Sequence, residues 1–169
     1  LLKQAAKIKK GAHIFAYKVR DPSQYGVVTF NEQNQVTSVS EKPKKPLSNW
    51  AITGLYFYDN NVVSLAKKLK PSKRLEFEIT DLNQKYFERK QLHVRLLGRV
   101  YAWLDAGTYD SLINASVFIK TVEDRQGLKI GCVEEIAYRM RFITAKQLQK
   151  LAKEIPTSYG EYLELILKE

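Results

Sequence analysis

The sequence predicts an α/β fold with a mixed sheet and a helical appendage at its C-terminal end. Short apolar runs with strand-like composition, separated by turn residues, occur between residues 13 and 97. Longer segments with helical periodicity lie among these runs and dominate after residue 127. The 169 residues are 44% apolar and 27% charged, which is typical of a folded chain with one ordinary core or most of a larger domain.

Five strands are expected, each rich in β-branched or aromatic residues and bounded by turn signals. They span residues 13–19, 26–30, 35–40, 50–58 and 92–97. The polar residues 31–34 indicate a hairpin between the second and third strands. Pro43 and Pro46 end the ladder after the third strand, because proline has no N–H to donate. Gly54 indicates a bulge or a close approach within the fourth strand.

Four helices are expected alongside these strands, from their periodicity and capping residues. They span residues 1–10, 60–69, 76–90 and 108–126. Gly11 and Gly127 follow the first and last of them as C-terminal stops. Asn60 or Asn61 is suited to cap the second.

After residue 127 the pattern becomes wholly helical. Three helices are expected there, over residues 134–142, 144–153 and 158–168. Thr144 with Gln147, and Ser158 with Glu161, have the spacing of capping boxes. These segments form the appendage on the α/β body.

Composition limits the partners of this chain. The net charge of +10 at pH 7 favours anionic partners. No arginine-rich block with interleaved aromatic residues occurs, so we expect no nucleic-acid partner. No apolar run is long enough to span a bilayer and no signal-peptide pattern is present, so we expect no membrane partner. The single cysteine, Cys132, excludes an internal disulfide and suits a cytoplasmic location.

Common catalytic motifs are absent from the sequence. His13 and His93 are isolated, and no zinc-ligand spacing surrounds them. No Gly-x-Ser-x-Gly elbow and no Walker phosphate loop occurs. Any chemistry would therefore use charge rather than a covalent intermediate.

Asp105 follows the apolar residues 100–104 and precedes the helix expected at 108–126. We expect this run to be a strand end that presents Asp105 at a turn, where α/β sheets bind ligands. A carboxylate there is a hard oxygen ligand suited to Mg²⁺. The alternative is that Asp105 only caps the helix.

Four further residues combine into a site for a sugar phosphate. Gly26 lets a ligand approach bare backbone, and Glu41 can accept hydrogen bonds from sugar hydroxyls. Lys42 and Arg74 supply cationic donors for a phosphate. Taken singly, each is explained by a solvated strand end, a surface cation or a turn. Their joint occurrence predicts one hollow shared with Asp105.

Several segments resemble the glucose-1-phosphate thymidylyltransferases, a family of sugar nucleotidyltransferases. They are residues 25–28, 40–43, 50–59, 78–83, 102–108, 118–119, 123–129, 134–137 and 159–160. The resemblance covers essentially the whole chain and implies part of a Rossmann-like nucleotidyltransferase fold. The chain departs from the family at Leu75, where a glycine usually follows the arginine, and at residues 99–101, where Arg-Gly is more usual.

The resemblance implies roles for the candidate residues. Asp105, Lys42 and Arg74 would be catalytic, with Asp105 as the ligand of Mg²⁺. The substrate-binding residues would be Tyr25, Gly26, Glu41, Lys42, Ile52, Arg74 and Trp103. Residues 1–127 would form the sugar-phosphate-binding part, and residues 128–169 a helical region for interface and regulation.

The resemblance also implies a second nucleotide site for product feedback, at a subunit interface of a homo-oligomer. Five residues match part of that site: Gly98, Arg99, Cys132, Glu135 and Ile136. This site would bind nucleotide without taking part in the reaction.

The implied reaction transfers dTMP from dTTP to glucose 1-phosphate and gives dTDP-glucose and pyrophosphate, for nucleotide-sugar (dTDP-rhamnose type) and polysaccharide biosynthesis. One alternative is a uridylyl or other sugar-phosphate specificity. Another is a non-catalytic regulatory or assembly module. The chain lacks an initiator Met and the family's glycine-rich nucleotide loop, so we expect a fragment that does not turn over alone. A processed natural start is the alternative.

Overall fold

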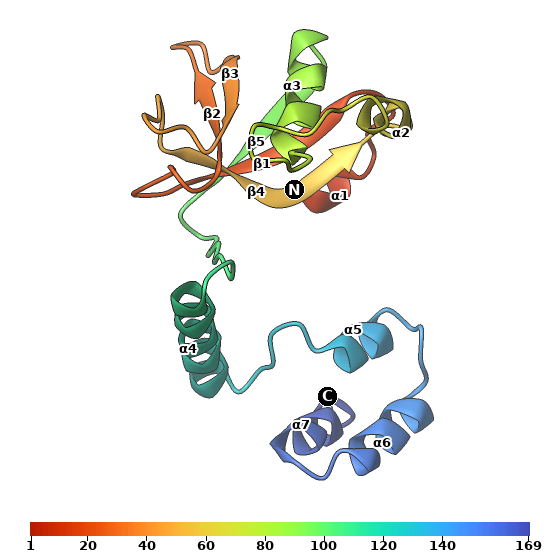
Figure 1. Ribbon diagram of the computed structural model, residues 1–169. Helices are drawn as coiled ribbons and strands as arrows, with labels where there is room; N and C mark the ends of the chain where they lie inside the picture. The colour runs from red at the N-terminus through yellow and green to blue at the C-terminus, as the bar shows by residue number, and fades with distance from the viewer. The chain divides into compact units, whose positions relative to one another are not determined.

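A five-stranded mixed sheet organises the first part of the chain (Figure 1). The computed structural model describes all 169 residues, and they fall into two compact units, Leu1–Trp103 and Leu104–Glu169. The first unit contains the sheet and three helices, and the second contains four helices. The α/β class predicted from the sequence is confirmed.

The sheet has the strand order β3-β2-β4-β1-β5. Its strands are β1 (Ala12–Lys18), β2 (Gly26–Phe30), β3 (Val36–Glu41), β4 (Trp50–Tyr58) and β5 (Leu92–Leu97). Each strand lies within one residue of the range expected from the sequence. β1 and β5 are parallel, while the other neighbours are antiparallel.

The predicted hairpin between β2 and β3 is confirmed. The Asn31 side chain organises its turn, because Asn31 Oδ1 accepts hydrogen bonds from the N–H groups of Gln33 and Gln35 at 3.1 and 2.8 Å. The ladder then runs to the pair Gly26 and Glu41. The register therefore places the start of β2 beside the end of β3.

β4 contains the bulge that Gly54 indicated. Ile14 of β1 pairs with Tyr56, but Ala16 pairs with Ile52, so extra residues of β4 lie between these two pairs. β4 pairs with β2 at a single position, Val27 with Ala51.

Helices cover both faces of the sheet in the first unit. They are α1 (Leu2–Ala5), α2 (Asn61–Ala66) and α3 (Ile79–Glu88). Leu65 of α2 and Leu82 of α3 pack with Ala12 on one face, and Ala5 of α1 packs with Phe15 on the other. A third cluster joins residues of all five strands, including Val36 near one sheet edge and Val94 near the other.

Asp59 holds the end of β4 to the helices. Asp59 Oδ1 accepts hydrogen bonds from the Asn61 N–H at 3.0 Å and the Tyr86 hydroxyl at 2.8 Å. Its Oδ2 accepts one from the Gly11 N–H at 2.8 Å. The expected asparagine cap of α2 is wrong, since Asp59 supplies the hydrogen bond that Asn60 does not.

The second unit contains α4 (Tyr109–Gln126), α5 (Val133–Arg139), α6 (Ala145–Glu154) and α7 (Ser158–Ile166). The capping box of Thr144 and Gln147 is confirmed. The box expected at Ser158 is wrong, because Thr157 caps α7 by accepting from the Tyr159 N–H. α4 ends at Gly127 as predicted, with the glycine at φ +68°.

Residues 98–108 form neither helix nor strand, so the strand end expected before Asp105 is wrong. No strand lies alongside these residues to complete a ladder. The two compact units meet within this segment, between Trp103 and Leu104. No helix is both long and apolar enough to cross a membrane.

Candidate functional site

The hairpin register brings two predicted site segments together. Gly26 and Glu41 are paired across β2 and β3. The Lys42 N–H donates to the Tyr25 carbonyl at 3.0 Å, and Lys42 itself has φ +38°. Residues from both strands therefore converge at one end of the hairpin.

Gly26 lies where any larger residue would displace neighbouring atoms. A Cβ at this position would lie 2.7 Å from Thr80 Oγ1, and 3.4 Å from both Glu41 Oε2 and Ile52 Cδ1. Real Cβ atoms do not approach a hydroxyl oxygen that closely. The structure thus brings together Gly26, Glu41 and Ile52, three residues that the resemblance places in the substrate site.

Thr80 orients the Glu41 carboxylate. Its hydroxyl donates a hydrogen bond to Glu41 Oε2, and Thr80 is 3% exposed at the start of α3. Sequence analysis did not assign Thr80 a role, although it lies within the resembling segment 78–83. Burial raises the pKa of the nearby Tyr56 hydroxyl, and the Glu41 charge raises it further.

Arg74 lies beside three carboxylates. Its Nε donates to Glu78 Oε1 at 3.1 Å, and its Nη2 to Glu78 Oε1 and Oε2 at 2.8 and 2.9 Å. Nη2 also lies 3.0 Å from Glu76 Oε2 and 3.7 Å from Glu41 Oε1. The Nη1 group takes part in none of these contacts, so it can donate to an anion.

Glu78 fixes the Arg74 loop. The Ser72 hydroxyl donates to Glu78 Oε1 at 2.8 Å. This hydrogen bond lowers the pKa of Glu78, and the charges of Arg74 and Lys42 lower it further. Both predicted phosphate cations therefore act on one carboxylate.

Trp103 lies against the predicted sugar site. Its ring centroid is 4.9 Å from that of Tyr25, with the ring planes at 70°. Tyr17 of β1 lies on it as well, with centroids 6.1 Å apart. The contact with Tyr25 is edge-to-face, an arrangement that aromatic pairs prefer, and the contact with Tyr17 is tilted.

Asp105 belongs to the second unit. Its Oδ2 accepts a hydrogen bond from the Gly107 N–H at 3.2 Å. The alternative that Asp105 caps the helix is wrong, because Thr108 caps α4. No group of three or more His, Cys, Asp or Glu residues lies together to hold a metal. One carboxylate does not make a Mg²⁺ site, so the residues of this chain do not fit the ion on their own.

The five predicted regulatory residues are divided between the units. Gly98 and Arg99 are exposed in the first unit. Cys132 is 3% exposed in the core of the second, and Glu135 accepts hydrogen bonds from Arg139 and Tyr162. Cys132 and Glu135 thus have structural roles, while Ile136 is 52% exposed.

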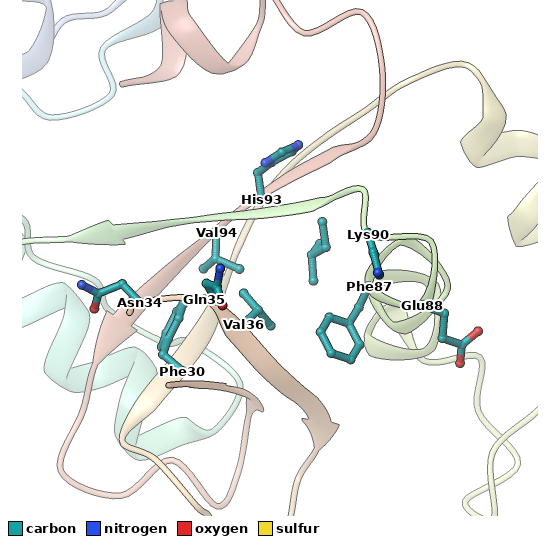
Figure 2. Close-up of a pocket in the computed structure, with 10 residues that line it drawn as sticks. Phe30, Asn34, Gln35, Val36, Phe87, Glu88, Lys90, His93 and Val94 are labelled. Carbon is teal, nitrogen blue, oxygen red and sulfur yellow. The ribbon is translucent and has the colours of Figure 1, made fainter. Parts of the chain in front are cut away.

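A cavity of about 890 Å³ lies elsewhere in the first unit (Figure 2). It is lined by Phe30, Asn34, Gln35, Val36, Phe87, Glu88, Lys90, Leu92, His93 and Val94. The rings of Phe30 and Phe87 point toward it from β2 and α3, with Val36 between them. None of the predicted site residues lines this cavity, whose lining comes from the β2–β3 hairpin, α3 and β5.

Comparison with known proteins identifies the family. Residues 1–122 match the family model described as nucleotidyl transferase. The chain belongs to the nucleotidyl transferase family. The α/β fold described above is thus that of a member of this transferase family.

Several known nucleotidyl transferases are similar to this chain. A glucose-1-phosphate thymidylyltransferase from Neisseria meningitidis is 50% identical over 169 residues, which are 99% of this chain and 59% of the relative. One from Mycolicibacterium smegmatis is 54% identical over 158 residues, 93% of this chain and 55% of the relative. The chain thus spans less than three fifths of either relative's length.

A solved structure supports the fold. It is described as that of a glucose-1-phosphate thymidylyltransferase from Bacillus anthracis in complex with sucrose. The identity is 38% and the TM-score 0.61, over 69% of this chain and 46% of the other.

Proposed function

We propose that this chain carries the sugar-phosphate-binding part of a glucose-1-phosphate thymidylyltransferase. The cluster of Gly26, Glu41, Arg74 and Thr80 supports this most directly. Relatives about half identical to the chain have this activity in their names. In the longer enzyme, dTTP and glucose 1-phosphate would give dTDP-glucose and pyrophosphate.

Each residue would act through its charge or shape. Glu41, held by Thr80, would accept hydrogen bonds from sugar hydroxyls, and Trp103 would form a wall of the site. The Arg74 Nη1 group and the Lys42 ammonium would bind the phosphate that attacks the nucleotide. Aligning this nucleophile and neutralising its charge are the main needs of phosphoryl transfer.

Three further parts of the proposal concern the longer enzyme. Asp105 is the candidate ligand of Mg²⁺, which needs more oxygen donors than this chain brings together. A feedback nucleotide site at an interface of a homo-oligomer would draw on Gly98, Arg99, Cys132, Glu135 and Ile136. The enzyme would act in the cytoplasm, and its product would enter dTDP-rhamnose and polysaccharide biosynthesis.

Calorimetric titration of the chain with glucose 1-phosphate tests the binding part. We expect binding, a loss of at least about tenfold in affinity for Glu41→Gln and for Arg74→Gln, and no loss for Arg125→Gln on α4. This loss corresponds to about 1.4 kcal/mol or more, a modest value for a charged hydrogen bond. Equal affinity for glucose 1-phosphate and for inorganic phosphate would contradict a sugar site.

A turnover assay tests whether this chain can catalyse the reaction alone. The chain incubated with dTTP, Mg²⁺ and glucose 1-phosphate should form no dTDP-glucose, because nothing in it cradles a triphosphate. Product detected above a Glu41→Gln control would show that the chain is catalytically sufficient and would overturn this part of the proposal.

A further inference from the structure

Glu78 is a buried carboxylate at the start of α3 whose side chain does not cap the helix. It occupies the N-cap position, where an acid usually accepts a hydrogen bond from the first N–H groups, but its side chain makes no such bond. That side chain is only 9% exposed. Because burial of a charge is costly unless the charge is paired, the partners of Glu78 explain its position.

The partners of Glu78 lie in the loop that carries Arg74. Glu78 Oε1 accepts from the Ser72 hydroxyl at 2.8 Å and from Arg74 Nε at 3.1 Å. Arg74 Nη2 donates to both carboxylate oxygens, at 2.8 and 2.9 Å. The Ser72 hydroxyl oxygen accepts from the Arg74 N–H at 3.1 Å. Glu78 therefore holds the guanidinium directly and the backbone of the loop through Ser72.

These hydrogen bonds fix which edge of the guanidinium faces Glu78. Nε and Nη2 form that edge, and a planar guanidinium then has its two remaining N–H groups on Nη1. A pair with two parallel hydrogen bonds sets the plane of the guanidinium as well as its position. The direction in which Nη1 can donate is thus determined by Glu78.

The start of α3 holds a candidate ligand for each half of the substrate. Thr80 donates to Glu41, the candidate ligand of the sugar. Glu78, two residues earlier, holds Arg74, the candidate ligand of the phosphate. Arg74 Nη2 also lies 3.7 Å from Glu41 Oε1. One turn of helix therefore fixes the spacing between the two candidate ligands.

We infer that Glu78 is a positioning residue for the phosphate of the substrate, and that it acts through Arg74 without contacting the substrate. This role rests on the proposed function, since the phosphate is that of glucose 1-phosphate. The charge of Glu78 opposes the binding of an anion nearby. Glu78 can therefore favour phosphate binding only through the orientation that it gives to Arg74.

Glu78→Gln and Glu76→Gln form a matched pair of variants. Each removes one negative charge beside Arg74, so charge alone would strengthen the binding of glucose 1-phosphate in both. An amide has one acceptor oxygen and cannot hold the guanidinium edge as a carboxylate does.

Calorimetric titration with glucose 1-phosphate compares the two variants with the native chain. We expect Glu78→Gln to bind at least about fivefold more weakly, because Arg74 loses its orientation. Glu76→Gln should bind at least as tightly as the native chain, since the Glu76 side chain is 63% exposed and such ion pairs contribute little.

Glu78→Gln in the Arg74→Gln background separates positioning from a general structural effect. A residue that acts through Arg74 has nothing left to position there, so the double variant should bind no more weakly than Arg74→Gln alone. A structural loss would instead add to the loss from Arg74→Gln. Urea unfolding, followed by tryptophan fluorescence, checks that each variant is folded.

Exchange of the Arg74 Nε–H proton with water tests the positioning without any ligand. Nuclear magnetic resonance should show exchange at least about tenfold faster in Glu78→Gln, and little change in Glu76→Gln, because only Glu78 accepts this proton. Ser72→Ala loosens the same loop and should give a smaller change in the same direction. This variant keeps the test open should Glu78→Gln not fold.

Three results would overturn the inference. The first is binding of glucose 1-phosphate by Glu78→Gln that equals or exceeds that of the native chain. The second is a further loss of affinity in the double variant. The third is unchanged exchange of the Arg74 Nε–H proton in Glu78→Gln or, if that variant is unfolded, in Ser72→Ala. If the native chain itself bound no glucose 1-phosphate, the proposed function would fail, while the exchange rates would still decide whether Glu78 positions Arg74.

Discussion

The hydroxyl oxygen of Thr80 lies 2.7 Å from the position that a Cβ on Gly26 would occupy. The same hydroxyl donates to Glu41, so these residues of three separate segments constrain one another. The sheet and the first turn of α3 are therefore joined at the point where a sugar would bind.

Gly26→Ala should disturb the contact between Thr80 and Glu41. The added methyl group forces Thr80 away from Glu41, and overpacking of this kind costs about 2 kcal/mol. We expect a lower midpoint of urea unfolding, followed by fluorescence of Trp50 and Trp103, and at least tenfold weaker binding of glucose 1-phosphate.

Gly54→Ala is the matched control, because a Cβ at Gly54 would meet nothing within 4 Å. Adding Thr80→Ala to Gly26→Ala should restore the unfolding midpoint but not the binding. An unchanged midpoint in Gly26→Ala itself would contradict the steric argument.

Leu75 adopts a strained conformation beside Arg74. It has φ +61°, in the left-handed region, and its side chain is 87% exposed. Leu75→Asn should raise the free energy of unfolding by about 0.5–1 kcal/mol, since asparagine tolerates this conformation better. Urea unfolding measures the change.

Leu47→Asn serves as the comparison for Leu75→Asn. Leu47 is 81% exposed and is not among the residues with positive φ. We expect a change within about 0.5 kcal/mol, as for most surface substitutions. If both variants gained equally, removal of exposed apolar surface would explain the effect instead of strain.

Asp59 should contribute stability that acid removes. The hydrogen bond from Gly11 lowers the pKa of Asp59 below its ordinary value of 3.8, and the bonds from Tyr86 and Asn61 lower it further. The folded state therefore binds this proton less readily than the unfolded state. The contribution is complete above the unfolded pKa and is lost as the pH falls through the folded pKa.

Asp59→Asn should cost about 2 kcal/mol at pH 7, because the Gly11 N–H loses a charged acceptor. Between pH 5 and 3, about the range of unperturbed carboxyl titration, the variant should lose less stability than the native chain. Asp21→Asn, whose exposed carboxylate accepts from Ser23 two residues along the chain, should remain within about 0.5 kcal/mol. Parallel pH curves for native and Asp59→Asn chains would exclude the proposed linkage.

His13 should make the first unit sensitive to mild acid. Its ring lies 4.5 Å from that of His93, and burial lowers the pKa of His13, with the charges of His93 and Arg95 lowering it further. The unfolded chain binds the proton first as pH falls through about 6.5, so stability decreases there. His13→Gln should show a smaller loss between pH 7.5 and 5.5, measured by tryptophan fluorescence in urea.

Local patterns predicted the elements well. Alternation and turn residues are properties of adjacent positions, so all five strands and the hairpin at Asn31 were predicted within one residue. The end of α4 at Gly127 could be predicted because it depends only on the backbone conformation of that glycine. Where two hydroxyl residues are adjacent, as at Thr157 and Ser158, the pattern cannot distinguish the cap, and the predicted box was wrong.

Contacts between distant segments were harder to predict. Asp59 caps α2 while it also binds Gly11 and Tyr86, partners far away in the sequence. Thr80 has its role only because α3 packs beside β3. The hairpin register pairs Gly26 with Glu41, two residues that their chemistry had suggested for one site. The strand end at Asp105 was wrong, because a strand exists only when a neighbour completes its ladder.

The position of Cys132 has a practical consequence for studying this chain. It is the single thiol, it is buried among the helices of the second unit, and it lies 3.1 Å from the Tyr159 hydroxyl. Both tryptophans lie in the first unit. Alkylation of the thiol therefore reports the opening of the helical unit, while indole emission reports the sheet, and the folding of the two halves can be followed separately in one unlabelled polypeptide.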